Sequence, residues 1–296
     1  MANLKEVRVR IASVKSTRQI TSAMKMVAAS KLRRAQNAIL GMRPYAKKLH
    51  EIMENLSSGL EGSDEGVYAD DRGNNKVLLV PVTSNRGLCG AFNANIIKET
   101  LNYIDAELSA QHKAGNVELY CIGKKGADIF TARGYKIATI NTAIFDNLTF
   151  DNTVKISEEL MEAFVSKKYD KIILIYNQFK NAAVQVIQVE QFLPVSKPEP
   201  SETAEKTEMK ANYIFEPSKA EILEALVPKS IKVQMYKALA DSFAAEHGAR
   251  MTAMHQATEN ADELIKELNL SYNKARQAAI TNEILEIVSG AEALKG

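Results

Sequence analysis

The sequence predicts an α/β fold in which an antiparallel coiled coil, built from the N- and C-terminal helices, carries an inserted Rossmann-like α/β domain. Three observations predict it. The stretch Lys229–Leu294 has no proline and only two glycines among good helix formers. The first fifty residues also carry a helical apolar pattern, and between these two ends short β-branched runs alternate with amphipathic segments. A helix over 229–289 would be ~90 Å long at 1.5 Å per residue, which indicates a coiled coil, a membrane span or a repeat.

The C-terminal stretch has the apolar spacing of a coiled-coil seam. Charged residues such as Arg250 and Lys266 interrupt it, which excludes a membrane span. Steps of four and three residues separate the apolar positions near its end, which are Ile280, Ile284, Ile287, Ala291 and Leu294. A looser stripe precedes them, at Ala261, Leu264, Leu268, Tyr272, Ala275 and Ala279. Such a stripe needs a partner, either a second helix or a large globular core.

The N-terminal segment is the candidate partner helix. Asn3 and Glu6 form a capping-box pattern, and heptad spacing joins Leu4, Val7, Ile11 and Val14. We expect the register to break at Arg18 and Thr21, with the apolar face continuing over Ile20, Met24, Val27 and Ala35. Gly41 and Pro44 are expected to bend or end this helix, and a second helical segment is expected from Tyr45 to Leu56.

Charge also distinguishes the two ends. Residues 1–50 contain twelve Lys and Arg against Glu6 alone, whereas the last fifty residues are rich in acids. Opposite charge fits two terminal helices that lie side by side, and we expect the longer C-terminal helix to project beyond its partner. A basic arm for nucleic acid or anionic lipid is the alternative. The apolar stripe on the same helix argues against a nucleic-acid binder, because that stripe must be buried against something.

The middle of the chain predicts a mainly parallel sheet. The expected strands are 76–82, 117–122, 135–140, 171–176 and 184–193, and the expected helices are 91–108, 124–133 and 154–165. Strands that alternate with helices are typical of a parallel α/β sheet. The predicted parts are an N-terminal coiled-coil helix at 1–57, an α/β domain at 76–195, a linker at 196–212 and a C-terminal coiled-coil helix at 213–296. Within the last part, Ser218 would cap a short helix and Pro228 would begin the long one.

Few residues suggest chemistry. The turn from Asn85 to Gly90 resembles a phosphate site on a helix N-terminus, but it lacks G-x-G-x-x-G and a tight turn explains its glycines. The segment from Ile122 to Gly126 is similarly predicted to be a turn. The four histidines are scattered, so no metal site is expected, and no catalytic residue or cofactor is predicted.

The sequence offers no sign of an apolar leader or a membrane span. Two cysteines, Cys89 and Cys121, form no disulfide framework, which favours a reducing compartment. No apolar run approaches ~20 residues, so any membrane association is expected to be peripheral.

Four stretches carry a resemblance to a known family. The run from Ile11 to Lys31 (IASVKSTRQITSAMKMVAASK) resembles the N-terminal helix of the γ subunit of F-type ATP synthases, and the run from Ile280 to Ala293 (ITNEILEIVSGAEA) resembles the C-terminal signature of that family. Ser84–Asn93 and Ala249–Met254 match it as well. The resemblance therefore covers both ends and the middle domain.

The resemblance implies a non-catalytic rotor. The coiled coil would enter a hexameric head of α and β subunits, and its foot would sit on the membrane c-ring with ε, in one copy per complex. It implies a peripheral location on the cytoplasmic side of the bacterial inner membrane and no binding of nucleic acid. The family motifs place coupling contacts to the catalytic subunits at Met24, Arg250, Arg276, Gln277, Thr281 and Glu283. For the foot, the expected contact residues are Arg33, Arg34, Tyr213 and Glu216.

Three other hypotheses stay open on the residues alone. A non-catalytic coiled-coil adaptor with a degenerate α/β domain would form a homodimer. An α/β enzyme using the turn from Gly87 to Gly90 would bind a nucleotide, and a basic-helix nucleic-acid binder would show salt-dependent affinity.

Overall fold

The computed structural model describes residues 4–57, 67–195 and 219–293. The chain forms two compact units, of which one comprises residues 1–29 with 250–296 and the other comprises residues 30–249. Two long helices contribute to both units: α1 (Leu4–Ser57) and α6 (Lys219–Ala293).

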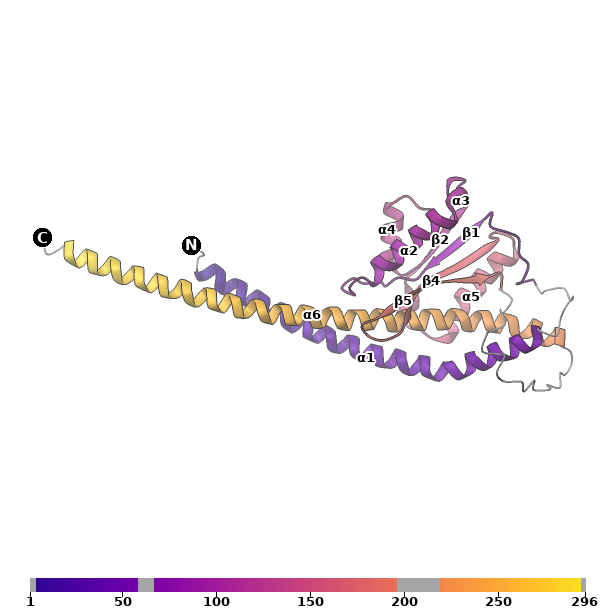
Figure 1. Cartoon of the computed structure of the whole chain (residues 1–296), viewed down its shortest axis with the longest axis horizontal. Helices are drawn as coiled ribbons and strands as arrows, with labels where there is room; N and C mark the ends of the chain where they lie inside the picture. The colour runs from indigo at the N-terminus through magenta and orange to yellow at the C-terminus, as the bar shows by residue number, and fades with distance from the viewer. Residues whose placement is uncertain (1–3, 58–66, 196–218, 294–296) are drawn as a thin grey trace. The chain divides into compact units, whose positions relative to one another are not determined.

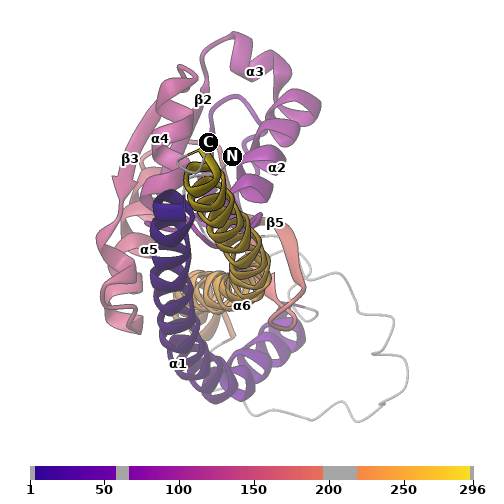
Figure 2. The same cartoon turned by 90° about the vertical axis from the view of Figure 1, so that its left-hand side faces the viewer.

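The larger unit contains a five-stranded sheet with strand order β3-β2-β1-β4-β5, and Figure 1 labels four of these strands, β1, β2, β4 and β5. Its strands are β1 (Val77–Pro81), β2 (Val117–Ile122), β3 (Ile137–Asn141), β4 (Lys171–Phe179) and β5 (Gln185–Leu193). The pairs among β1 to β4 are parallel and β5 pairs antiparallel with β4, which confirms the mainly parallel prediction. Figure 2 shows β3 and β5 at opposite edges of the sheet.

Helices cover both faces of this sheet, and each face has its own core. Leu78 and Val80 point to one face, where they pack with α5 (Phe150–Val165) and with Ile231 and Met235 of α6. Val77 and Leu79 point to the other face, which α2 (Phe92–Glu107) and α4 (Lys124–Ala132) cover. The central strands are therefore apolar on both sides, as expected for a parallel sheet enclosed by helices.

Two short elements and the start of one helix differ from the sequence prediction. The helix α3 (Ser109–Lys113) and a 3-10 turn at Ala143–Phe145 were not predicted. Helix α5 begins at Phe150, four residues before its predicted start, because the Thr149 side chain accepts a hydrogen bond from the Asn152 backbone N–H.

Both long helices run through the prolines that were expected to interrupt them. The prediction of two segments in the N-terminal helix is wrong, because α1 is one helix of 54 residues with Pro44 inside it. Pro228 likewise lies inside α6 and does not begin it. A proline removes one helical hydrogen bond, and tertiary packing offsets that loss. Buried Ile39 and Leu49 flank Pro44, and buried Ile231 follows Pro228.

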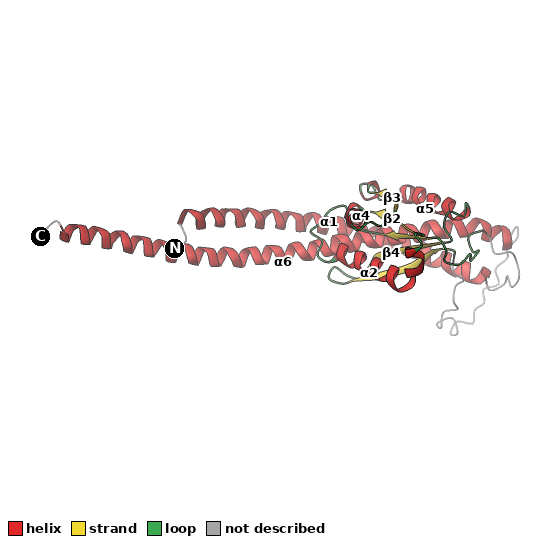
Figure 3. Ribbon diagram, turned by 90° about the horizontal axis from the view of Figure 1, so that it is seen from above, coloured by secondary structure: helices red, strands yellow, loops and turns green. Residues whose placement is uncertain are grey.

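In the smaller unit, the two helices pair antiparallel over α1 residues 4–29 and α6 residues from 250 onward (Figure 3). Three of the polar pairs between the two helices define the register. Arg8 donates to the Tyr272 hydroxyl at 2.8 Å, Arg18 forms an ion pair with Asp262, and Thr21 shares a 2.8 Å hydrogen bond with Thr258. As the α1 number rises, the α6 number falls by nearly the same amount, which is the signature of antiparallel neighbours.

The heptad register of α1 does not break at Arg18 and Thr21, contrary to the prediction. Thr21 is buried in the helix interface, in heptad continuity with Val7 and Ala28. Ile20 and Val27, which were expected to continue the apolar face, are more than half exposed. The Thr21 hydroxyl can occupy this position because it bonds to Thr258 and to the Arg18 carbonyl oxygen.

Within the described parts of the chain, no helix combines the length and apolar character needed to cross a bilayer.

Candidate functional site

The C-terminal end of α6 carries an exposed apolar helix face. Helix α1 begins at Leu4, and its most N-terminal described bond to α6 joins Arg8 to Tyr272. Beyond that point α6 continues to Ala293, as Figure 1 shows. Ile280, Ile284 and Ile287 are 48%, 55% and 66% exposed, respectively. The predicted C-terminal seam is thus present, and no described residue of α1 covers it.

Four predicted coupling residues lie on this end of α6. Arg276, Gln277, Thr281 and Glu283 are all exposed to solvent. The Thr281 hydroxyl donates to the Gln277 carbonyl oxygen within the helix. At 3.6 residues per turn, Arg276 and Glu283 lie on one side of the apolar stripe and Gln277 and Thr281 lie on the other, so polar groups border the stripe on both sides.

Two arginines affect the side chain of Tyr272, where the exposed end of α6 begins. The Arg8 hydrogen bond lowers the pKa of Tyr272 from its ordinary value, and the nearby charges of Arg8 and Arg276 act in the same direction. The Arg8 guanidinium also lies over the Tyr272 ring, 5.7 Å from its centroid. Two Arg side chains thus flank the last tyrosine of the helix pair.

The remaining predicted contacts are less uniform. Met24 is half-buried, between the buried positions Thr21 and Ala28. Arg250 is only 8% exposed, so its side chain is largely enclosed within the chain. Arg33 and Arg34 are exposed, whereas Tyr213 and Glu216 lie outside the described residues.

The turn that resembled a phosphate site is closed by its own hydrogen bonds. The Asn93 side chain accepts from the Ser84 backbone N–H, and the Ser84 hydroxyl donates to the Arg86 carbonyl oxygen. Leu88 and Gly90 have φ values of 62° and 58°, so the turn uses Gly90 where a positive φ is needed. These bonds support the interpretation of this segment as a tight turn.

The same loop also accepts hydrogen bonds from the backbone N–H groups at the N-terminus of α4. Backbone N–H groups of Lys124 and Gly126 donate to the side chains of Asn85 and Thr83, and the Lys125 N–H donates to the Ser84 carbonyl oxygen. A Cβ at Gly123 would lie 2.0 Å from the Thr83 carbonyl oxygen, which explains this glycine by close packing. The groups that would hold a phosphate at a helix N-terminus are already engaged here.

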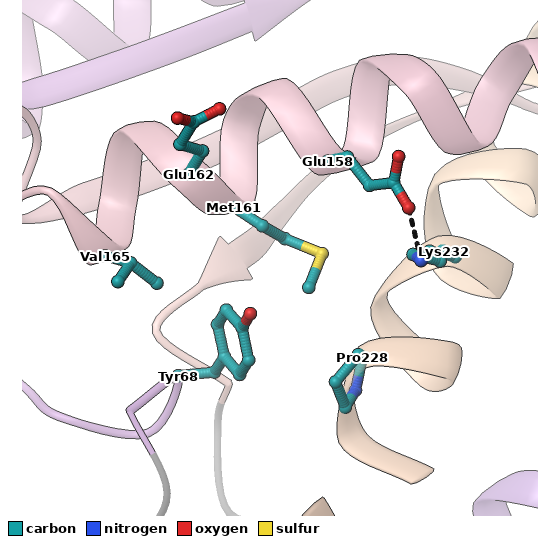
Figure 4. A pocket seen from close by; sticks show the side chains of 7 residues that line it. All are labelled: Tyr68, Glu158, Met161, Glu162, Val165, Pro228 and Lys232. Carbon is teal, nitrogen blue, oxygen red and sulfur yellow. Dashed lines mark hydrogen bonds and ion pairs between the residues drawn. The ribbon is translucent and has the colours of Figure 1, made fainter. Parts of the chain in front are cut away.

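A pocket of the larger unit lies between α5, the start of α6 and Tyr68 (Figure 4). It is open and has a volume of about 450 Å³. Its lining consists of Tyr68, Glu158, Met161, Glu162, Val165, Pro228 and Lys232. Lys232 Nζ lies 2.7 Å from a carboxylate oxygen of Glu158, so these two charges neutralise one another. Among the described residues that line it there is no Ser, Cys or His that could serve as a nucleophile or an imidazole base.

The thiols and potential metal ligands give no further site among the described residues. Burial raises the pKa of Cys121 to about 12, so this thiol stays protonated and unreactive at neutral pH. No cluster of His, Cys, Asp or Glu in the described segments could hold a metal ion.

Comparison with known proteins agrees with this arrangement. A family model described as ATP synthase matches residues 3–294. The ATP synthase gamma chain of Flavobacterium johnsoniae is 60% identical over 296 residues, which cover 100% of both chains. The gamma chain of Chlorobaculum tepidum is 46% identical over 295 residues, again covering 100% of both.

Two solved structures share the fold. A chain of the Tetrahymena thermophila mitochondrial ATP synthase central stalk and c-ring is 26% identical, with a TM-score of 0.58, and the match covers 80% of this chain and 99% of that chain. A chain of the Euglena gracilis mitochondrial ATP synthase has a TM-score of 0.67 at 20% identity, and the match covers 98% of this chain and 94% of that chain.

A pair of long terminal helices that carries an inserted α/β domain and leaves one apolar helix end uncovered is typical of a subunit of a larger assembly. The chain belongs to the ATP synthase gamma chain family. Proteins of this family form the central-stalk rotor, and this chain is accordingly a non-catalytic subunit that serves ATP synthesis and proton transport.

Proposed function

We propose that the exposed end of α6 is the part of this rotor that couples c-ring rotation to conformational cycling in a hexameric head of α and β subunits. The observation that carries the proposal is the uncovered stripe at Ile280, Ile284 and Ile287, beside exposed Arg276 and Gln277. Exposed apolar stripes of this kind mark surfaces that another polypeptide covers.

The mechanism follows from asymmetry. A single helix end has different side chains on each side, so it presents a different surface to each catalytic subunit around it. Contacts that favour one subunit conformation over another shift that subunit's equilibrium, and rotation moves this bias from one subunit to the next. Guanidinium and amide groups at Arg276 and Gln277 suit directed, charge-assisted bonds to acidic loops. Thr281 follows Gln277 on one side of the stripe, and Glu283 follows Arg276 on the other.

The other proposed contacts lie farther from this end. Met24 would contribute a flexible apolar contact to a bearing with the catalytic subunits. Arg250, being largely buried, would act through the residues packed around it. Exposed Arg33 and Arg34, together with Tyr213 and Glu216, would belong to a foot that meets ε and the c-ring.

The proposed setting is one copy per complex, peripheral to the cytoplasmic side of the bacterial inner membrane. The similar Tetrahymena chain comes from a structure of a central stalk together with a c-ring, which supports the c-ring as partner. The proposed functional division keeps an N-terminal coiled-coil helix at 1–57, an α/β domain at 76–195, a linker at 196–212 and a C-terminal coiled-coil helix at 213–296.

Photo-crosslinking in the assembled complex tests the proposal. A photoreactive residue at position 284 should crosslink to α or β subunits, whereas the same residue at exposed position 113 on α3 should not. Crosslinks from position 284 to a second copy of this chain would support the alternative, a homodimeric coiled-coil adaptor. Native mass measurement of the same preparation gives the copy number independently.

A further inference from the structure

The crevice at the carboxyl ends of β1 and β4 is filled by the chain itself. Parallel sheets commonly bind ligands where neighbouring strands lead away in opposite directions, and here that point lies between β1 and β4. Cys89 and Phe92 follow β1, and Phe179 ends β4. These residues pack against Ala245 and Ala249 of α6 in one cluster, so a helix occupies the position of a ligand.

Small residues let α6 approach this crevice closely. A Cβ at Gly248 would lie 3.2 Å from the Ala182 Cα and 3.3 Å from an edge carbon of the Phe179 ring. Ala244 and Ala245 are fully buried. The Asn177 side chain donates to the Phe92 carbonyl oxygen at 3.3 Å, which ties the β1 side of the crevice to the β4 side. Helix α6 therefore lies close to the sheet in this crevice, with residues that follow β1 on one side and residues at the end of β4 on the other.

We propose that this crevice is a clamp that fixes the rotational position of α6 on the α/β domain, and that Gly248 is its positioning residue. The proposal rests on the rotor function described above, because only a rotor needs this contact to resist torque. The clamp grips α6 at Ala245, Gly248 and Ala249. Torque applied to the α/β domain would reach α6 through these contacts, in addition to the covalent connections.

Two substitutions loosen the clamp in opposite ways. Gly248→Val inserts an isopropyl group, which is a Cβ with two methyl groups, against Ala182 and Phe179, and this forces α6 away from the crevice. Phe179→Ala removes one wall without adding any atom. Gly41→Ala is the matched control, because Gly41 also lies in a long helix and a Cβ there meets nothing within 4 Å.

The measurement is the number of protons pumped per ATP hydrolysed by the assembled complex in vesicles, normalised to the amount of complex. Both loosening variants should still hydrolyse ATP. The number of protons that they pump per ATP should be lower than in the wild type, and the maximal proton gradient should be mostly lost. The control Gly41→Ala should match the wild type in both measurements. A purely structural role would lower the melting temperature and the yield of complex without changing the ratio.

A normal ratio in Phe179→Ala complexes would overturn the clamp, even if Gly248→Val failed to assemble. Failure of the wild-type complex to pump protons would instead contradict the rotor function, so the two failures are distinguishable.

Discussion

The side-chain hydroxyls of Thr21 and Thr258 lie 2.8 Å apart across the helix pair, at a position where a coiled coil ordinarily buries two apolar side chains. Each hydroxyl also lies within hydrogen-bond distance of a backbone carbonyl oxygen of its own helix: Thr21 of Arg18 and Thr258 of Met254. One hydroxyl can therefore donate across the interface while the other donates to its own helix. The polar pair is satisfied on both sides, and it stabilises the antiparallel register without leaving an unbonded group.

Single and double replacement of this pair should give different results. Thr21→Val or Thr258→Val alone should lower the free energy of unfolding by about 0.5–1 kcal/mol, since the remaining hydroxyl keeps its backbone partner. The double variant should return to within about 0.5 kcal/mol of the wild type, because two apolar groups then meet. Urea unfolding of the full chain measures all four proteins. Additive losses in the double variant would show that the two hydroxyls do not interact.

Replacing Arg276 and Gln277 together with Ala should weaken coupling while leaving the fold unchanged. Both side chains are exposed, and surface changes of this kind alter stability by less than about 0.5 kcal/mol. ATP-driven proton pumping by the reconstituted complex should fall, while the melting temperature of the isolated chain stays constant. Lys274→Ala, at an exposed neighbouring position, is the control. If the double variant pumped protons at the wild-type rate, the assignment of both residues to the coupling surface would be wrong.

Met24→Lys should raise the barrier to rotation. Met24 is half-buried beside exposed Met26 and Val27, so the new ammonium group would reach solvent and could pair with an acidic loop of a partner. Turnover of the complex should fall and its activation energy should rise, whereas Met26→Lys, at a more exposed position, should change both less. Identical activation energies for Met24→Lys and wild type would contradict a bearing contact here.

Three tyrosines should make the α/β domain sensitive to high pH. Burial raises the pKa of Tyr120, Tyr169 and Tyr176, and hydrogen bonds to Glu159, Glu118 and Glu190, respectively, raise them further. Because the folded pKa values exceed the unfolded value of about 10, the stabilisation is complete below pH ~10 and is lost as the pH rises above it. The urea midpoint of the full chain should therefore decline above pH ~10.

Tyr176→Phe isolates one of these groups. The substitution removes a 2.9 Å hydrogen bond to Glu190, whose carboxylate keeps a hydrogen bond from Gln234. We therefore expect the free energy of unfolding to fall by about 1–2 kcal/mol at pH 7. We also expect the urea midpoint to decline less steeply at high pH. Exposed Tyr45→Phe should change neither value. An unchanged slope above pH ~10 in Tyr176→Phe would show that this phenol does not contribute to the alkaline transition.

The sheet and the two long helices were predictable because their signals are local and repeated. Runs such as Val77–Val80 are apolar on both faces of the strand. The heptad spacing of Leu4, Val7, Ile11 and Val14 indicates which side of α1 is buried. The register beyond Arg18 was not predictable, since a buried Thr21 is indistinguishable from an interruption until Thr258 is placed opposite it. The continuity of α6 through Pro228 likewise depends on contacts from residues distant in sequence.

The candidate site was predictable in part. The apolar spacing at Ile280 to Ile287 is visible in the sequence, whereas the exposure of that face depends on where α1 begins. The clamp at Gly248 could not be predicted from the neighbouring sequence. A glycine is needed in this helix only because Phe179 and Ala182 pack closely against it, and both lie far away in the sequence.

Direct observation of rotation is the sharpest test of this chain as a rotor. Cys89 and Cys121 are buried, so Lys113→Cys on α3 provides a single exposed thiol for a bead or fluorophore. With the α and β subunits immobilised and ATP supplied, the probe should turn continuously in one direction. A probe that stays fixed while the same complexes hydrolyse ATP would contradict the rotor function.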